Sequence, residues 1–318
     1  MSRPKIVVSL TGGLGNQLFQ FAAALDQAGE SVFGIDQNLG LPTLSPDGRP
    51  ELAEFALPIN ARFEPKRAMS RFTMRSTNFM MLIGKSATRI RTGHLAKVIN
   101  ILSSVVLSVY LKEPRRIHAA KGLGYYEVEK ILRRAFLVGY FQSYRWASNP
   151  STLQKIKNMK LSSDSELIQK LREVSAEEKP LIVHIRLGDY TKIPSFGIPS
   201  NEYYKSAIEK HMKAGICKKV WLFSNEPEKA MAKIPMAYRD QIRIINEVEG
   251  SSAKTLEAMR LGWGYVIANS TYSWWGAFLS YKDHPLVIAP TPWFKTEQNP
   301  NELIPPEWHL EAAWPEVK

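Results

Sequence analysis

Short apolar runs alternate with longer amphipathic stretches along most of the chain. An apolar run lies at 6–10, a stretch with apolar residues at helical spacing follows at 17–28, and a second run lies at 31–35. Short runs bounded by turn formers are typical of buried strands, whereas the longer period indicates a helix. The N-terminal stretch therefore predicts a strand, a helix and a second strand. Residues 40–60 hold several turn formers and predict a loop with short structure.

The second half of the chain repeats this alternation more clearly. Strands are predicted at 181–185, 220–223, 242–245, 265–268 and 286–289, and helices at 202–214, 252–261 and 273–281. Strands that alternate with helices favour a parallel sheet covered on both faces, which is the α/β class. A chain of 318 residues is also too long for one average domain. We expect two α/β domains that meet near 150–180, and we divide them as 1–165 and 166–318.

Four polar segments directly follow predicted strands. They are GGLGNQ at 12–17, HIRLGDY at 184–190, SNE at 224–226 and NSTYSWW at 269–275. In open parallel sheets, ligands bind beyond the carboxyl ends of the strands. Four such clusters are harder to explain as chance turns than any one of them alone, so we treat them as candidate binding segments.

The segment HIRLGDY offers a cation at the end of a strand. Arg186 is the first candidate, because a guanidinium stays charged and presents fixed donors that match phosphate oxygens. Gly188 allows a sharp turn, and Asp189 can orient a neighbour, cap a helix or accept a sugar hydroxyl. His184 lies in an apolar run, where a core histidine and a ligand contact are both open. The alternative for the whole segment is a strand end with a surface Arg–Asp pair.

The segment NSTYSWWGA at 269–277 joins a predicted strand to a predicted helix. Hydroxyl groups and the unpaired N–H groups of a first helical turn together bind phosphate readily. Simple N-capping is the alternative, but a cap needs only one such side chain. The candidates here are Asn269, Ser270, Thr271 and Ser273. Trp274 and Trp275 are expected to be packing residues, with a pocket wall as the alternative for one of them.

The segment GGLGNQ is less specific. Gly13 and Gly15 have the first spacing of a dinucleotide fingerprint, but Leu18 stands where the third glycine would be. No Gly-Lys-Ser/Thr follows, so it is not a phosphate-binding P-loop either. A tight turn that opens a helix is the alternative to a backbone that a ligand approaches closely.

The segment FSNE at 223–226 also follows a strand. Phe223 is in a position to stack on a base, and Asn225 or Glu226 to bond to the edge of that base. A solvent-facing loop acid is the alternative for Glu226.

The charge balance points to an anionic partner. Net charge is +12, the sequence pI is about 9.6, and Lys and Arg gather at 62–122 around an apolar run at 98–111. That run of about fourteen residues is shorter than the roughly twenty that span a bilayer. A buried helix with a solvated basic flank and an interfacial segment on anionic lipid are both open. Nucleic acid is the weakest alternative, because no recognition motif accompanies the charge.

Other features exclude whole classes of site. The one cysteine, Cys217, cannot form an internal disulfide, and the sequence holds no Cys/His cluster of the metal-binding kind. The first ten residues run into a predicted strand and lack the apolar stretch and cleavage site of a signal peptide. We therefore expect a cytoplasmic protein, which the interfacial interpretation would place on the inner face of the membrane.

Taken together, the motifs resemble those of the bacterial α-1,2-fucosyltransferases of glycosyltransferase family 11. The segments concerned are GGLGNQLFQFA, GYFQS at 139–143, HIRLGDY, FSNE and IANSTYSWWGAFL. Their order and approximate spacing agree, and the resemblance covers nearly the whole chain, with little contribution from 60–120. It implies two facing Rossmann-like domains of the GT-B type with a cleft between them. The C-terminal domain would bind the donor, and the N-terminal domain would shape the acceptor side.

The implied activity is transfer of L-fucose from GDP-fucose to the 2-hydroxyl of a galactose unit of a glycan, with inversion and without a metal or other cofactor. Arg186 maps to the arginine that meets the donor phosphate, and Asn16 to the asparagine that approaches the donor and the reacting centre. Asp189 is a third catalytic candidate. The candidates for donor binding are Gly13, Gly15, Gln17, His184, Phe223, Ser224, Asn225, Glu226, Asn269, Ser270, Thr271 and Ser273.

Two departures from the family pattern bear on this site. Many members have a second arginine where this chain has Leu187, which leaves the phosphate to Arg186 and to the donors that follow the strand at 265–268. Paired acids are frequent after FS, where this chain has Asn225 and Glu226, and this puts base recognition at that spot in doubt.

Without a metal, a fixed cation and oriented donors must stabilise the leaving diphosphate. A carboxylate can take the acceptor proton, and Asp36, Glu54 and Asp189 all stay open as that base. The expected partners are GDP-fucose, a galactose-terminated glycan that is lipid-linked or free, and an anionic membrane surface, but no nucleic acid. Synthesis of O-antigen or another surface polysaccharide is the expected setting. The alternatives are a transferase for another GDP-sugar or linkage and a non-catalytic sugar-nucleotide-binding protein.

Overall fold

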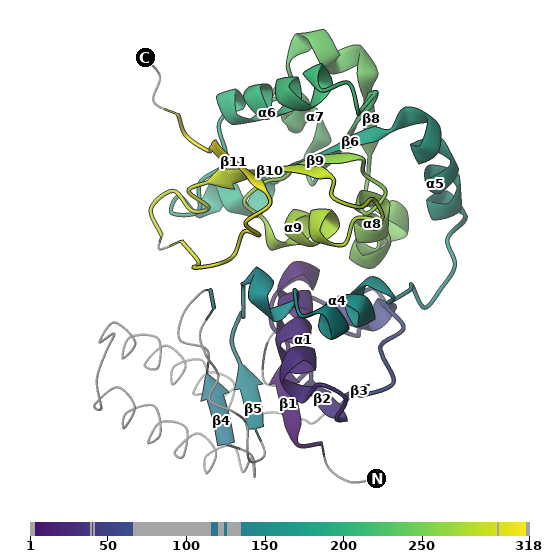
Figure 1. Ribbon diagram of the computed structural model, residues 1–318, viewed down its shortest axis with the longest axis vertical. Helices are drawn as coiled ribbons and strands as arrows, with labels where there is room; N and C mark the ends of the chain where they lie inside the picture. Colours follow the sequence, from purple (N-terminus) through teal and green to yellow (C-terminus); the bar gives the residue numbers. More distant parts are fainter. Residues whose placement is uncertain are drawn as a thin grey trace. The chain divides into compact units, whose positions relative to one another are not determined.

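Two parallel sheets, each in its own compact unit, form the framework of the protein (Figure 1). The computed structural model describes residues 4–38, 40, 42–65, 116–119, 124–125, 135–297 and 299–315. One unit comprises residues 1–160 with 300–303, and the other comprises 161–299 with 304–318. The sequence pattern places the division after residue 165, whereas the structure places it after Lys160 and assigns Pro300–Leu303 to the first unit.

The described strands of the first unit lie in the order β3-β2-β1-β5-β4, and all these pairings are parallel. The elements are β1 (Ile6–Ser9), α1 (Leu14–Ala28), β2 (Phe33–Asp36), β3 (Ala61–Phe63), β4 (Arg116–Ala119), β5 (Ala135–Val138) and α4 (Pro150–Lys157). Leu18, Phe21 and Leu25 of α1 are buried, as their helical spacing predicts. The predicted strand–helix–strand beginning of the chain is confirmed.

The described strands of the second unit lie in the order β11-β10-β9-β6-β7-β8, again with parallel pairings. They are β6 (Pro180–Ile185), β7 (Lys219–Ser224), β8 (Ile242–Ile245), β9 (Gly264–Val266), β10 (Leu286–Thr291) and β11 (His309–Ala312). The helices are α5 (Glu166–Glu178), α6 (Asn201–Lys213), α7 (Pro227–Met231), α8 (Ser252–Met259) and α9 (Thr271–Phe278). Figure 1 shows α6 and α7 on one face of the sheet and α8 and α9 on the other.

This strand order is that of a Rossmann fold. Read from β8, with β6 as the first strand of the unit, it is 3-2-1-4-5-6. The predicted α/β class, with two Rossmann-like sheets, is therefore confirmed.

Two tryptophans anchor the start of α9 in the core of the second unit. Trp274 and Trp275 are fully buried, and their ring centroids lie 4.9 Å apart. Trp274 also stacks on Phe278 at 4.5 Å. Both are packing residues, as the sequence predicts, and they fix the helix whose first turn follows β9.

In the second sheet the direction of winding reverses between β6 and β9, and in the first sheet β1 and β5 are neighbours. Parallel α/β sheets bind ligands outside the carboxyl ends of the strands at such points. Four motif segments lie at the carboxyl ends of these four strands. Residues 12–17 and 139–143 follow β1 and β5, while 184–190 and 269–277 reach the ends of β6 and β9.

Most of the basic segment at 62–122, including the apolar run at 98–111, lies outside the described residues. In the part of the chain that the structure describes, no helix is long and apolar enough to cross a membrane.

Candidate functional site

Arg186 stands on a turn that the neighbouring strand holds in place. The backbone N–H of Leu187 donates to Oδ1 of Asn225 at 2.9 Å. Gly188 has a φ of +58°, and a Cβ there would lie 2.3 Å from Nδ2 of Asn225, so glycine fits this turn where other residues would clash. The guanidinium carbon of Arg186 lies 5.8 Å from the ring centroid of Tyr190. A half-buried cation is thus carried by a turn of defined shape at the carboxyl end of β6.

The segment FSNE supports this turn. Phe223 is 1% exposed within β7, so its ring packs in the core and is not available to stack on a base. The hydroxyl oxygen of Ser224 accepts a hydrogen bond from the N–H of Glu226 at 3.1 Å. The carboxylate of Glu226 pairs with Lys229 and accepts from the N–H of Gly188, and both contacts lower its pKa. The stacking predicted for Phe223 is therefore corrected, and Ser224 and Glu226 have contacts that shape the loop.

His184 is a buried histidine of β6. Burial and, to a smaller extent, the nearby charge of Arg186 lower the pKa of His184 to about 3. Its ring centroid lies 6.1 Å from that of Tyr272 in α9, and its Nδ1 has no hydrogen-bond partner among the described residues. His184 is thus neutral at physiological pH. Of the two roles that the sequence left open, a core histidine and a ligand contact, its burial supports the first.

The hydroxyl and amide groups before α9 are largely engaged within the protein. Ser270 caps the helix by accepting from the N–H of Tyr272 at 3.4 Å, and Ser273 donates back to the carbonyl of Ser270 at 3.2 Å. Asn269 is fully buried, and its Nδ2 donates to the carbonyls of Phe196 and Gly197. These contacts give Ser270, Ser273 and Asn269 structural roles and support the capping alternative for this segment.

Thr271 is the half-exposed candidate of this group, and it opens the helix. The first turn of α9 carries hydroxyl and aromatic side chains without an acid, so the positive end of the helix dipole is not offset locally. The hydroxyl of Tyr190 donates to the carbonyl of Asn269 at 3.2 Å and so ties the loop after β6 to the residues before α9. Arg186 and the start of α9 therefore flank the reversal point of the second sheet, an arrangement that suits an anionic group such as a diphosphate.

The glycine loop of the first unit has a different chemistry. The carboxylate of the buried residue Glu51 accepts a hydrogen bond from the N–H of Leu14, the first residue of α1, at 2.6 Å. A carboxylate already occupies this helix end, so it is not suited to a phosphate. Gly13 is the N-cap residue of α1 and has an extended backbone conformation, and Gly15 is buried in the first turn of the helix. Sequence reasoning missed Glu51, which lies in the predicted loop at 40–60.

Gln17 is corrected from a donor-binding candidate to a structural residue. It is fully buried, and its Nε2 donates to the carbonyls of Gly12 and Thr43, each at 2.9 Å. Its Oε1 accepts from the N–H of Leu52 at 2.9 Å. The amide of Gln17 thus binds three backbone groups and connects the glycine loop to the loop at Thr43 and to the short 3-10 helix at Leu52.

Asn16 is half-buried in the first turn of α1, beyond the carboxyl end of β1, and a second side chain orients it. Nε2 of Gln142, in the loop after β5, donates to Oδ1 of Asn16 at 2.9 Å. Gly12 has a φ of +71°, and a Cβ there would lie 2.7 Å from Nδ2 of Asn16. Sequence reasoning did not single out Gln142, although the motif GYFQS contains it and follows a short apolar run.

The three candidate bases have different surroundings. Asp36 lies buried at the end of β2 and accepts hydrogen bonds from Asn38 Nδ2 at 2.9 Å and from the hydroxyl of Ser9 at 3.4 Å. Glu54 ends a short 3-10 helix, Glu51–Glu54, and is half-buried. The side chain of Asp189 lies outside the described part of the chain. Across the described residues, no group of three His, Cys, Asp or Glu side chains is arranged to hold a metal ion.

Comparison with known proteins identifies the family. Residues 134–312 match the model of glycosyl transferase family 11, which is more than half of the chain, so the chain belongs to this family. The chain is 26% identical over 316 residues to an alpha-1,2-colitosyltransferase of Escherichia coli, covering 95% of this chain and 97% of the relative. It is 27% identical over 316 residues to the O-antigen biosynthesis glycosyltransferase WbnK of Escherichia coli, covering 94% and 98%.

Among solved structures, a NodZ alpha-1,6-fucosyltransferase soaked with GDP-fucose is 14% identical, with a TM-score of 0.49, covering 94% of this chain and 100% of that chain. The family resemblance that the motifs indicate is confirmed, and the protein is a glycosyltransferase.

Proposed function

We propose that this family 11 glycosyltransferase transfers L-fucose from GDP-fucose to the 2-hydroxyl of a galactose unit of a glycan, with inversion at the sugar. Its relationship to an alpha-1,2-colitosyltransferase supports the 1,2 linkage. The observation that carries the proposal is the turn of Arg186, which Asn225 clamps beside the start of α9 at the reversal point of a Rossmann-like sheet.

The leaving group explains why this arrangement matters. Cleavage of the bond between fucose and phosphate leaves negative charge on GDP, and a preorganised cation with oriented N–H donors stabilises that charge. Arg186 supplies the cation, and Thr271 with the first turn of α9 supplies neutral donors. We propose that this set replaces a metal ion, so that EDTA leaves the rate unchanged.

Asn16 is proposed to act from the first unit, where its carboxamide approaches the donor and the reacting centre. The acceptor hydroxyl must lie in line on the face of the sugar opposite GDP, so positioning supplies much of the rate. Asp36, Glu54 and Asp189 remain the candidates for accepting its proton.

We further propose that the acceptor is an intermediate of O-antigen or another surface polysaccharide, as the name of WbnK suggests for that relative. The basic segment at 62–122 would hold the protein against an anionic membrane on the cytoplasmic side. Binding to anionic liposomes that weakens with salt, with no binding to neutral liposomes, is the expected result; equal binding to both kinds would remove the membrane contact from the proposal.

A second donor is favoured by one specific relative. Because the chain resembles an alpha-1,2-colitosyltransferase, GDP-colitose is the main alternative to GDP-fucose. Colitose lacks the 3-hydroxyl of fucose, and a site that bonds to this hydroxyl rejects the deoxy sugar strongly, whereas a purely apolar pocket discriminates weakly.

One assay tests linkage and donor together. The protein is incubated with GDP-fucose, GDP-colitose, GDP-mannose or a UDP-sugar and with a panel of galactose-terminated glycans, and the product linkage is determined by NMR. Transfer of fucose to the 2-hydroxyl of galactose supports the proposal. A product from GDP-colitose alone would move the assignment to the second donor, and another linkage or no product with any GDP-sugar would overturn it.

A further inference from the structure

The motif GYFQS contains a residue that orients Asn16. Gln142 lies in the loop after β5, and Asn16 lies in the first turn of α1, which follows β1. Strands β1 and β5 are parallel neighbours, so both residues lie beyond the same edge of the sheet. Nε2 of Gln142 donates to Oδ1 of Asn16 at 2.9 Å, a bond between residues 126 positions apart in sequence. Gln142 is 7% exposed, so the bond is largely shielded from water.

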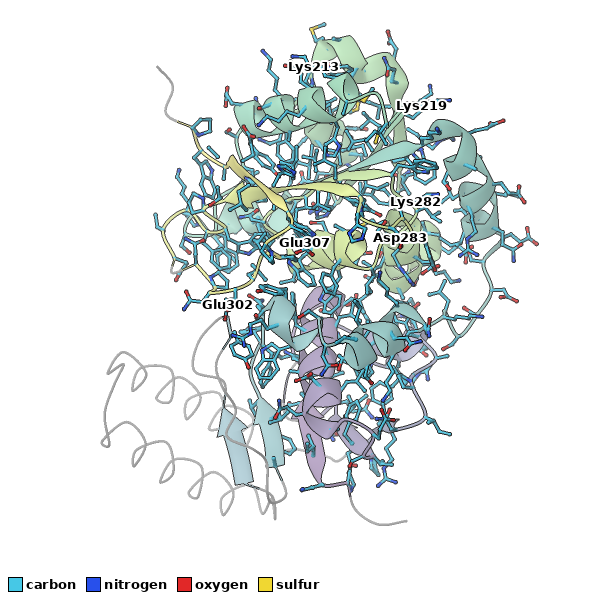
Figure 2. The ribbon with its side chains drawn as sticks, viewed as in Figure 1. Lys213, Lys219, Lys282, Asp283, Glu302 and Glu307 are labelled. Atoms are coloured by element: carbon cyan, nitrogen blue, oxygen red, sulfur yellow. The ribbon has the colours of Figure 1, made fainter. Side chains whose placement is uncertain are left out.

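The loop that carries Gln142 is held in a single shape. Phe141 has a φ of +53°, an unfavourable backbone conformation for a large side chain, and such strain persists only where the surroundings impose it. Its buried ring packs edge-on against Trp146 with centroids 5.9 Å apart. The hydroxyl of Ser143 donates to the carbonyl of Glu302, a residue labelled in Figure 2, at 2.6 Å. These contacts fix where Gln142 stands.

The bond distinguishes the two ends of the Asn16 carboxamide. An amide's oxygen and NH₂ group are nearly equal in size, so hydrogen bonding decides which way the group faces. Because Oδ1 accepts from Gln142, Nδ2 lies on the side of Gly12, as the 2.7 Å approach to a Cβ at that position indicates. A carboxamide held this way presents a hydrogen-bond donor on that side.

The other buried glutamines of this unit show what a purely structural role looks like. Gln17 bonds through both ends of its amide to backbone groups, and Gln20 bonds through both ends to the backbone of Thr11. Gln142 bonds instead to a candidate catalytic side chain, and its own buried Oε1 has no partner among the residues that the structure describes. An unpaired buried oxygen does not favour stability, which points away from a stabilising role.

We propose that Gln142 is a positioning residue, which fixes the carboxamide of Asn16 so that its NH₂ group, and not its oxygen, faces the reacting groups. The inference rests on the proposed function for its effect on turnover. The orientation itself does not depend on that function and is measured separately.

Two variants separate positioning from packing. Gln142→Met keeps the volume but removes the donor, and Gln142→Glu replaces the donor with an acceptor that favours the flipped Asn16. We expect Tm to stay within a few degrees, the KM for the GDP-sugar to change little, and kcat to fall about tenfold for Met and further for Glu. Gln154→Met, at an exposed position on α4, is the matched control with unchanged kcat. Unchanged kcat in both Gln142 variants would overturn the proposal.

A double-mutant cycle tests whether Gln142 acts through Asn16. In an Asn16→Ala background, Gln142→Met should change kcat less than about twofold, because the group that it positions is gone. If the losses in kcat multiply instead, Gln142 works independently of Asn16 and the proposal fails.

Side-chain amide NMR gives a readout that needs no turnover. The NH₂ signals of Asn16, assigned by their loss in Asn16→Ala, should shift in Gln142→Glu and stay in place in Gln154→Glu. Unshifted signals would overturn the positioning role. If the signals shift while wild-type protein transfers no sugar from any GDP-sugar, the proposed function fails and the orientation of Asn16 by Gln142 stands.

Discussion

Oδ1 of Asn225, just beyond the end of β7, accepts a hydrogen bond at 2.9 Å from the backbone N–H of Leu187, the residue next to Arg186. A side chain that follows β7 thereby fixes the backbone that follows the neighbouring strand, β6. The second arginine that many family members carry is absent here, and Leu187 is buried. The single guanidinium therefore depends on this contact for its position, which makes Asn225 a residue of the arginine turn.

Replacement of Asn225 by alanine should weaken GDP binding. The N–H of Leu187 loses its partner, and Arg186 must be ordered by the ligand when it binds, so we expect Kd to rise about fivefold to tenfold. Isothermal titration calorimetry measures this change. Asn158→Ala, at an exposed residue in the first unit, is the control that should bind as the wild type does. Unaltered GDP affinity in Asn225→Ala would show that the clamp is dispensable.

Replacement of Gln17 by methionine should cost stability and leave donor binding alone. The change leaves two carbonyls and one N–H in the interior without their hydrogen-bond partner, and we therefore expect Tm to fall by about 5–10 °C. Thermal unfolding followed by circular dichroism measures the loss, with Gln154→Met as the exposed control. A normal Tm together with lost GDP binding would return Gln17 to the donor site.

The burial of His184 predicts a dependence of stability on pH. The folded protein keeps His184 neutral down to about pH 3, whereas the unfolded chain protonates it below about pH 6.5. The unfolded state thus binds the extra proton between these values, so stability is complete above about pH 6.5 and declines as the pH falls toward 3. His211, whose pKa burial lowers to about 4, acts in the same direction.

Denaturant midpoints between pH 4 and pH 7 test this linkage. His184→Gln should flatten the acid slope by roughly half, since His211 supplies the remainder. The exposed His284→Asn should keep the wild-type slope. An unchanged slope in His184→Gln would mean that His184 titrates alike in both states.

Replacement of Gly12 by alanine should disturb Asn16. A Cβ would lie 2.7 Å from Nδ2 of Asn16, and the backbone at a φ of +71° disfavours any residue with a side chain. We expect kcat to fall about tenfold or more, while GDP affinity changes little because Arg186 belongs to the other unit. Steady-state kinetics with the donor varied measures both quantities.

Asn16→Ala is the companion to this variant. It should lower kcat by at least as much and leave GDP binding nearly intact. A fall in Tm with little change in kcat would instead make Asn16 a structural residue.

The sequence pattern predicted most strands of the second sheet but only β1 and β2 of the first. The runs at 181–185 and 220–223 lie within β6 and β7, because buried parallel strands are continuously apolar. The edge strand at 242–245 is found with the bounds expected. Strands β3, β4, β5 and β11 were missed. Strands β3 and β11 are short, and their residues are half-buried or exposed, so neither shows an apolar run.

The candidate site was predicted in position but only partly in role. Arg186, Asn16 and the start of α9 lie beyond the carboxyl ends of β6, β1 and β9, as the positions of the motifs predicted. The roles of Gln17 and Phe223 were missed, because burial and hydrogen-bond partners depend on contacts between segments distant in sequence. Gln17, for example, forms hydrogen bonds with residues 43 and 52, and no local sequence pattern predicts those contacts.

The affinity of the protein for GDP, measured by calorimetry before and after Arg186→Ala, tests the central claim most directly. A lost charge-assisted contact to phosphate should raise Kd at least about tenfold, with circular dichroism unchanged. Arg239→Ala, which removes a half-buried arginine before β8, should bind GDP as the wild type does. A folded Arg186→Ala protein that binds GDP with wild-type affinity would contradict the assignment of the diphosphate to this turn.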